Sequence, residues 1–165
     1  MKKYELTAEF IEKLGKKLFR IKALISFGSV EAGELGGYVE KEDNLAQDGD
    51  AWVCGNAWVY DNARVYGNAW VCGNARVCGN ADYLLIGRIG SRFSFTTFFK
   101  NKDKGITVSC GCFLGTIAEF RAKVTDTHGN NKHAKMYNLA ADMAELQILG
   151  EEHFDKLNTN KSEPF

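Results

Sequence analysis

The chain has 165 residues, a length that suffices for one domain with its own hydrophobic core. Its 21 Lys and Arg residues balance 21 Asp and Glu residues, which excludes a polycation acting mainly on nucleic acid or anionic lipid. A hydrophobic fraction of 45% with 25% charged residues excludes wholesale disorder, and 17 Gly against a single Pro is an unusual balance for a globular chain.

The N-terminal segment, residues 1–32, has the sequence of a β-rich cap. Residues 17–27, KLFRIKALISF, are typical of a strand, and Phe10, Ile11 and Leu14 indicate a short helical or extended lead-in. We expect no signal peptide, because no suitable segment opens the chain, and no apolar run approaches the length of a membrane helix. These features predict a soluble cytoplasmic protein without membrane contact, whose five Cys are reduced.

A six-residue repeat occupies the middle of the chain. Residues 51–80 read AWVCGN, AWVYDN, ARVYGN, AWVCGN and ARVCGN, and counting in sixes extends the pattern in degenerate form over 33–86, with Leu35 at the Val position. Ala and Val alternate with period two, so both face one side, and Gly-Asn or Asp-Asn then supplies a corner that tolerates positive φ. The pattern predicts a three-sided β-solenoid of about three coils, 18 residues each, which we take as left-handed by analogy.

The solenoid places residues 18 apart next to each other on its outer surface. Trp52 should stack on Trp70 and Trp58 on Arg76, while Tyr60 falls beside Cys78 and Arg64 beside Asp82. Cys54 and Cys72 should lie within disulfide range, but a reducing cytoplasm favours free thiols in a packing slot.

The pattern changes after the repeat, and residues 87–150 read as a small α+β domain. Strand-like segments at 83–90, 92–100 and 106–113 surround the turn NKDKG, which predicts a hairpin. Thr116 and Glu119 form a capping box that opens a helix, and Gly129 is a suitable stop. A second helix is expected at about 131–149, followed by a polar, frayed tail over 151–165. The whole chain is therefore predicted to be mainly β, a solenoid capped by an N-terminal β-rich segment and a C-terminal hairpin with two helices.

The repeat and its flanks are similar to those of a known family. The run GELGGYVEKEDNLAQDGDAWVCGNAWVYDNARVYGNA resembles the YdcK-type β-solenoid repeat, and TTFF…ITVSCGCFLGTIAEFRAKVTDTHG resembles a C-terminal domain of short members from phages and mobile elements of gut Firmicutes. The resemblance covers nearly the whole chain. It implies a phage-encoded protein acting in the host cytoplasm, for which inhibition of a bacterial defence system such as CRISPR–Cas is a plausible role.

Longer relatives in this family are often assigned as hexapeptide acyltransferases, in which a catalytic His serves a CoA cleft between coils. The present chain has no His between residues 1 and 127, and its fourth hexad position is Cys or Tyr. An acyltransferase-like enzyme therefore remains an alternative that rests on fold analogy alone. We expect no enzyme activity, no catalytic residue and no cofactor.

Two small clusters outside the repeat have a possible chemistry. Cys110 and Cys112 share strand parity with Ile106 and Val108, so a buried strand face is the simplest interpretation, with metal binding beside a His or redox chemistry left open. His128 and His133 flank the turn between the expected helices and fit a polar loop. We predict no metal site.

The outward aromatic and Arg residues of the repeat are the strongest candidate site, because these residue types dominate protein interface hot spots. We expect a host protein partner to contact Trp52, Trp58, Tyr60, Arg64, Tyr66, Trp70 and Arg76. The alternative interpretation is that the N- and C-terminal caps or a second copy of the chain cover these side chains. The few basic residues within 51–82 disfavour direct nucleic-acid binding. The predicted function is a non-enzymatic module that occludes a partner sterically, and we also expect the chain to form a homo-oligomer, a dimer. The alternatives are the acyltransferase and a purely structural protein that self-associates.

Overall fold

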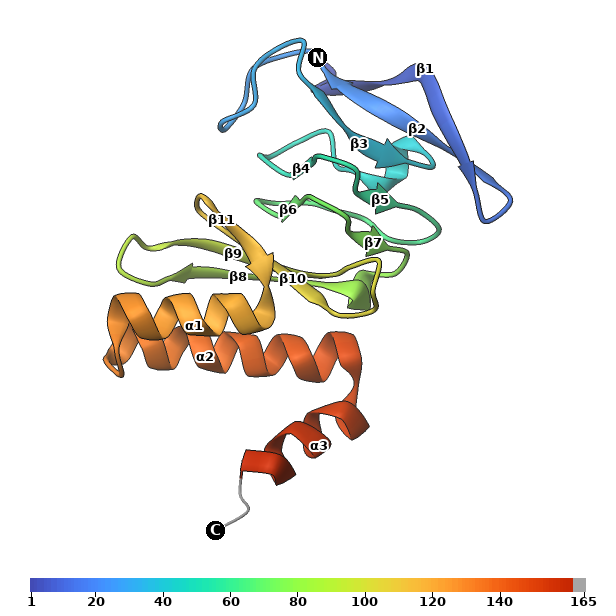
Figure 1. Ribbon diagram of the computed structural model, residues 1–165. Coiled ribbons are helices and arrows are strands. Elements are labelled where there is room, and N and C mark those ends of the chain that lie inside the picture. Colours follow the sequence, from blue (N-terminus) through green and yellow to red (C-terminus); the bar gives the residue numbers. More distant parts are fainter. Residues whose placement is uncertain (162–165) are drawn as a thin grey trace.

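The computed structural model describes residues 1–161. Figure 1 shows the arrangement of its parts: the N-terminal strands lie at one end, the short strands of the repeat follow, and a second sheet separates the repeat from the helices at the opposite end. Neighbouring segments in the sequence are thus largely neighbours in space, as in a stack.

The N-terminal cap is a pair of antiparallel strands. Strand β1 (Tyr4–Lys13) pairs with β2 (Lys16–Ala23), which pairs in turn with β3 (Leu35–Val39). The prediction of a strand near residues 17–27 is confirmed, and the lead-in is extended rather than helical. The pair covers the first turn of the repeat, where Lys3 is buried and its Nζ donates to the carbonyl of Ala51 at 2.7 Å.

The perfect hexads pair in parallel with the predicted spacing of 18 residues. Strand β4 (Trp52–Val53) pairs with β6 (Trp70–Val71), and β5 (Trp58–Val59) pairs with β7 (Arg76–Val77). The corners are also as expected, because Gly55 and Gly73 take φ values of +63° and +67°, a conformation that suits Gly. The repeated Ala and Val side chains are buried and fill a narrow interior.

The spacing is different in the degenerate part of the repeat. Tyr38 pairs with Trp58 and Leu45 with Val65, an offset of twenty residues in each case. A 3-10 turn, η1 (Glu42–Asn44), inserts between the two segments, and the side chain of Asn44 donates to the Ala63 carbonyl. The hexad assignment over 33–45 is therefore wrong, and Leu35, expected in the interior, is 51% exposed. Gly49 and Asp50 return to the expected pattern, because Gly49 has a positive φ beside Gly67 and the Asp50 N–H donates to the Gly67 carbonyl.

The expected fold class is wrong as well. Residues 1–161 form a mixed α/β structure of several small sheets and three helices, and this described part contains no left-handed or other three-coil solenoid. Each parallel strand of the repeat has only two residues, and one ladder continues into the antiparallel cap to give the sheet order β1-β2-β3-β5-β7. Within residues 1–161, the regular offset of 18 residues relates just one turn of the repeat to the next, β4 and β5 to β6 and β7. The sequence departs from the hexad on both sides of these two turns.

A four-stranded antiparallel sheet follows the repeat. After the 3-10 turn η2 (Asn80–Asp82), strands β8 (Tyr83–Ile89), β9 (Ser94–Lys100), β10 (Ile106–Cys110) and β11 (Phe113–Thr116) are ordered β11-β10-β9-β8. The predicted hairpin is confirmed, since β9 and β10 pair across the turn at 101–105.

The helices form the end of the molecule farthest from the cap. Helix α1 (Ile117–His128) opens with the predicted Thr116–Glu119 capping box, and α2 (Lys132–Ala144) continues into the π-helical turn η3 (Glu145–Leu149). A third helix, α3 (Glu151–Lys161), replaces most of the expected frayed tail, and residues 162–165 lie outside the described part of the chain.

Two hydrophobic cores meet at the four-stranded sheet. Phe99 of β9 packs with the Ala and Val residues of the repeat, whereas its neighbour Phe98 packs with Phe120 of α1. Both side chains are fully buried. Because consecutive residues of a strand face opposite sides, β9 is a structural partition shared by the two cores.

Candidate protein-binding surfaces

A row of Arg and aromatic side chains crosses the outer face of the five-stranded sheet. Register pairs place Arg20, Tyr38, Trp58 and Arg76 side by side on β2, β3, β5 and β7. The Arg76 guanidinium lies 3.6 Å from the centroid of the Trp58 ring, and Arg20 lies 4.5 Å from that of Tyr38. The expected Trp58–Arg76 stack is confirmed, and desolvation lowers the pKa of Arg76.

Tyr60 continues this face beyond the Trp58–Arg76 stack. Its hydroxyl and the Cys78 thiol are neighbours, as predicted. The pKa of Tyr60 is raised, mainly by burial of the hydroxyl and to a smaller extent by the nearby Cys78 thiol. The carboxylate of Asp82 accepts from the Cys78 backbone N–H at 3.0 Å and approaches Lys100. The pair expected between Arg64 and Asp82 is therefore replaced by contacts of Asp82 within its own turn.

Arg64 and Tyr66 lie on another part of the surface. The ring of Tyr66 is 55% exposed and packs edge-on against Tyr83, with 6.4 Å between centroids. The Tyr83 hydroxyl donates to the backbone carbonyl of Arg64, whose side chain is exposed. Both predicted residues remain accessible to a partner.

Trp52 is not available to a partner. Its side chain is fully buried, with Tyr4 and Phe27 packed edge-on against the indole at centroid distances of 6.4 and 5.3 Å. Gly36 also abuts it, since a Cβ at that position would come 2.7 Å from the ring. Trp52 does face outward from its turn of the repeat, but the N-terminal cap covers it, and its Nε1 finds no hydrogen-bond partner within the described chain.

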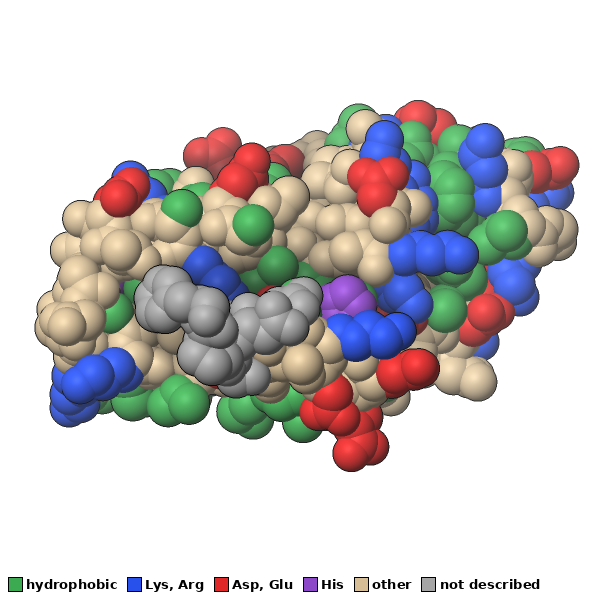
Figure 2. Space-filling view, turned by 60° about the horizontal axis from the view of Figure 1, so that its bottom comes forward, with side chains coloured by type: hydrophobic (Ala, Val, Ile, Leu, Met, Phe, Trp, Pro, Cys, Tyr) green, Lys and Arg blue, Asp and Glu red, His purple; other side chains and the backbone are tan. Residues whose placement is uncertain are grey.

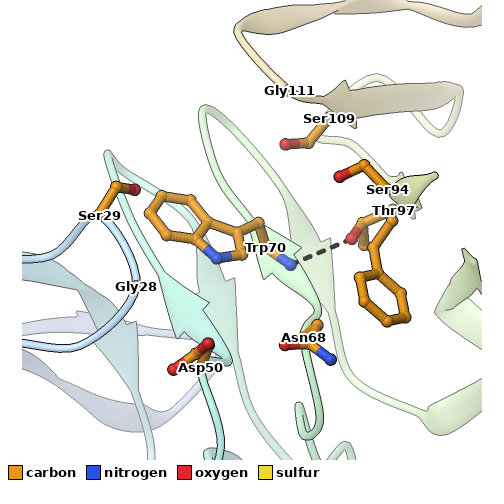
Figure 3. Close-up of a pocket in the computed structure, with 10 residues that line it drawn as sticks. Gly28, Ser29, Asp50, Asn68, Trp70, Ser94, Thr97, Ser109 and Gly111 are labelled. Atoms are coloured by element: carbon orange, nitrogen blue, oxygen red, sulfur yellow. Dashed lines mark hydrogen bonds between the residues drawn. The ribbon is translucent and has the colours of Figure 1, made fainter. Parts of the chain in front are cut away.

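Trp70 is the partly exposed counterpart of Trp52 in the next turn. It lines a pocket of about 250 Å³ between the turn at Gly28 and Ser29, two corners of the repeat, and strands β9 and β10 (Figure 3). Its backbone N–H donates to the Thr97 hydroxyl at 3.1 Å, which ties β6 to β9. The seven predicted residues therefore occupy several separate places rather than one continuous face.

An exposed apolar stripe on α2 and η3 was missed by the sequence interpretation. Met136, Leu139, Met143 and Leu146 are 38%, 63%, 57% and 43% exposed, and they follow one another at intervals of three, four and three residues. The opposite face of the same helix, with Ala141, Ala144 and Ile148, is buried. The stripe was readable in the sequence as a second apolar face of this helix. Figure 2 brings this end of the molecule forward and shows hydrophobic side chains at its surface, along the lower edge.

The Cys and His clusters outside the repeat meet at Tyr137. The Tyr137 ring stacks on His128 at 5.8 Å between centroids, and its hydroxyl neighbours the Cys110 thiol, which also accepts from Thr96. The pKa of Tyr137 is raised to about 12, mainly by burial of its hydroxyl and to a smaller extent by the Cys110 thiol. Cys112 is exposed in the β10–β11 turn and does not join Cys110. In residues 1–161, no three His, Cys, Asp or Glu side chains are grouped to hold a metal ion.

Cys54 and Cys72 are joined by a disulfide, whereas the sequence interpretation favoured free thiols. Their Cα atoms are 4.5 Å apart, since the two residues follow directly on the paired strands β4 and β6. Cys78, the third Cys of the repeat, is free. The prediction that the first two lie within bonding range is confirmed.

Comparison with known proteins does not support the family expected from the sequence. No family model matches the chain, and a search of the curated proteins finds no match. Membership of the YdcK-type family is not supported, and the several mixed and antiparallel sheets contradict its solenoid fold. The phage origin and the role against CRISPR–Cas rested on that resemblance and lose their basis with it.

The helices were also compared with the requirements of a membrane span. None of those in residues 1–161 combines the length and apolar character that crossing a bilayer demands.

Proposed function

We propose that this chain is a non-enzymatic protein-binding module, and that its principal contact surface is the apolar stripe of α2 and η3. The observation that carries the proposal is the exposure of four large apolar side chains, Met136, Leu139, Met143 and Leu146, on one helix whose other face is packed in the core. Isolated exposed apolar residues are ordinary, but a continuous stripe is typical of an interaction site.

The spacing of the stripe indicates what kind of partner fits it. Intervals of three and four residues put side chains on one line of a helix, the arrangement through which two helices pack. Met adapts its shape to different partners, so two Met residues suit a contact surface. Lys132 and Lys135 are exposed at the N-terminal end of the stripe. An amphipathic helix with acidic residues at one end is therefore the expected ligand.

The predicted outward residues provide a second, smaller contribution. Trp58 and Arg76 are half-buried and already engaged with each other, whereas Arg64 and Tyr66 are exposed. These residues stand on a framework that a disulfide and two parallel ladders hold in place. A rigid surface loses little entropy on binding, which favours its use as a steric block.

A charge placed in the stripe tests the proposal. Leu139→Lys should remove a captured partner or weaken its binding at least about tenfold, because one desolvated charge opposes burial of the whole face. Leu114→Lys is the matched control, since Leu114 is a comparably exposed Leu on β11. Both variants should be compared with the native chain in quantitative pull-downs, followed by titration of the purified partner in a calorimeter.

The outcome separates the candidate functions. Loss of the partner with Leu139→Lys and its retention with Leu114→Lys supports the stripe. Retention by both variants, with loss on Trp58→Ala, would move the site to the five-stranded sheet. If the native chain alone changes size with concentration and Leu139→Lys abolishes this, the stripe serves a second copy and not a foreign partner.

A further inference from the structure

The pocket beside Trp70 has a lining that the proposed protein-binding function does not use. Three parts of the chain form it: the turn at Ser29, the repeat corners at Asp50 and Asn68, and strands β9 and β10 with Ser94 and Ser109. Figure 3 shows the Trp70 indole lying across the pocket, with Asp50 and Asn68 on one side and Ser94 and Ser109 toward the other. None of the α2 stripe residues lines it.

Most polar side chains of this pocket make no hydrogen bond to the protein. Within residues 1–161, those of Ser29, Asp50, Asn68, Ser94 and Ser109 make none, although the Asp50 carboxylate interacts electrostatically with Lys3; Thr97, by contrast, is occupied by the backbone N–H of Trp70. Three hydroxyls, one amide and one carboxylate therefore surround a single indole with their hydrogen-bonding capacity free. Polar groups gathered from distant segments around an aromatic face are the pattern of a small-ligand site.

The backbone of Trp70, whose ring lies at the centre of the pocket, is fixed by its neighbours in the sheets. Trp70 pairs with the buried Trp52 on β4, and its own backbone is tied to Thr97 of β9. The side chain is half-buried, so part of its surface is left to the pocket. An indole face carries negative quadrupole charge, which attracts the weakly positive C–H groups of a ligand stacked on it.

We propose that this pocket binds a saccharide residue, a ring with one C–H face for Trp70 and several hydroxyls for the polar side chains. Hydroxyls both donate and accept, which matches the mixture of Ser, Asn and Asp groups. A purely apolar ligand would leave these five groups unpaired. A phosphate or sulfate would meet the Asp50 carboxylate and find no Lys or Arg among the described lining residues, since Lys3, which interacts with Asp50, does not line the pocket.

The size of the pocket agrees with one small ring. Its volume of about 250 Å³ falls just below the range of roughly 300 to 1,000 Å³ that is usual for drug-sized ligands. The pocket would hold a terminal or single sugar unit, and a longer chain would have to extend into solvent. Binding should therefore be weak for monosaccharides, with Asp50 and Asn68 setting the preference among ring stereoisomers.

Saturation-transfer NMR with the intact chain tests the proposal directly. The probes are glucose, galactose, mannose, N-acetylglucosamine and their common disaccharides, with choline as a cationic control. At least one sugar should receive saturation at its ring C–H protons, and choline should not. Trp70→Ala should abolish the transfer, whereas Trp58→Ala, which removes a Trp outside the pocket, should leave it unchanged.

Two further variants guard against misfolding and define the chemistry. Ser29→Trp adds bulk at an exposed turn and should block the pocket while the circular dichroism spectrum stays native. Asp50→Asn keeps an acceptor and should weaken sugar binding by no more than about tenfold. No transfer to any sugar, or transfer that survives both Trp70→Ala and Ser29→Trp, would overturn the proposal. Binding of choline that Asp50→Asn eliminates would also overturn it, in favour of a cation site.

Discussion

The repeat and the C-terminal half of this molecule are built on opposite principles. The repeat buries small Ala and Val side chains between two-residue parallel strands, and a disulfide joins two of its turns. The C-terminal half buries large aromatic rings, such as Phe98 and Phe120, between longer antiparallel strands and two helices. A narrow interior therefore leaves the large residues of the repeat on the outside, where flanking segments decide whether they are covered.

Trp52 and Trp58 give the sharpest test of that conclusion, because both face outward from the repeat. Trp52→Ala should lower the free energy of unfolding by about 3–5 kcal/mol, since it empties a buried site under the cap. Trp58→Ala should cost far less, because its ring is half-exposed. Chemical denaturation followed by far-UV circular dichroism measures both. Equal losses would mean that the cap does not contribute the packing described.

The disulfide distinguishes the repeat from the C-terminal half chemically. Opening the Cys54–Cys72 bond with Cys54→Ser and Cys72→Ser together should lower the free energy of unfolding by about 3 kcal/mol, because a loop of this length is no longer closed in the unfolded chain. Cys78→Ser, at the free Cys of the repeat, serves as the control. A reducing agent should lower the melting temperature of the native chain and leave that of the double variant unchanged.

Alkaline pH should lower the stability of the fold through Tyr83, which lies where the repeat meets the C-terminal half. Burial raises the pKa of Tyr83 above its ordinary value of 10.0, so the folded state keeps a proton that the unfolded chain releases. The resulting stability is complete below about pH 10 and declines as the pH rises toward the pKa of the folded state. Tyr83→Phe should reduce the slope of unfolding free energy against pH by up to about 1.4 kcal/mol per pH unit above pH 10. An unchanged slope in urea titrations would contradict this role.

The smallest expected effect concerns the outer row of the repeat. Arg76→Ala removes the guanidinium from the Trp58 ring and should cost about 0.5–1 kcal/mol, the range for a cation–π contact near the surface. Arg76→Lys keeps the charge but loses the flat stacking group, so its free energy of unfolding should lie between those of the native chain and of Arg76→Ala. A loss as large as that of Trp52→Ala would show that the row is part of the core and not a surface.

Local features, and the pairing that an exact repeat imposes, were predictable because the spacing of residues in the sequence decides them. The Thr116–Glu119 capping box, the hairpin around 101–105 and the 18-residue pairing of the perfect hexads all appear where the sequence places them. The fold class was not predictable, since the pattern does not say how far a two-residue ladder propagates. The offset changes from twenty residues at Leu45 and Val65 to eighteen in the perfect hexads between Leu45 and Asp50, just after the 3-10 turn that the Asn44 side chain ties to Ala63.

The sequence by itself determined which side chains face inward and which outward in the perfect hexads, because alternation along an extended backbone is a local property. Only the tertiary structure decided what lies over the outward ones. The cap buries Trp52, the turn at Gly28 and Ser29 leaves Trp70 beside a pocket, and Arg76 covers Trp58. The exposed stripe of α2 follows the same rule, since whether an apolar helix face is core or surface depends on which long-range neighbours reach it.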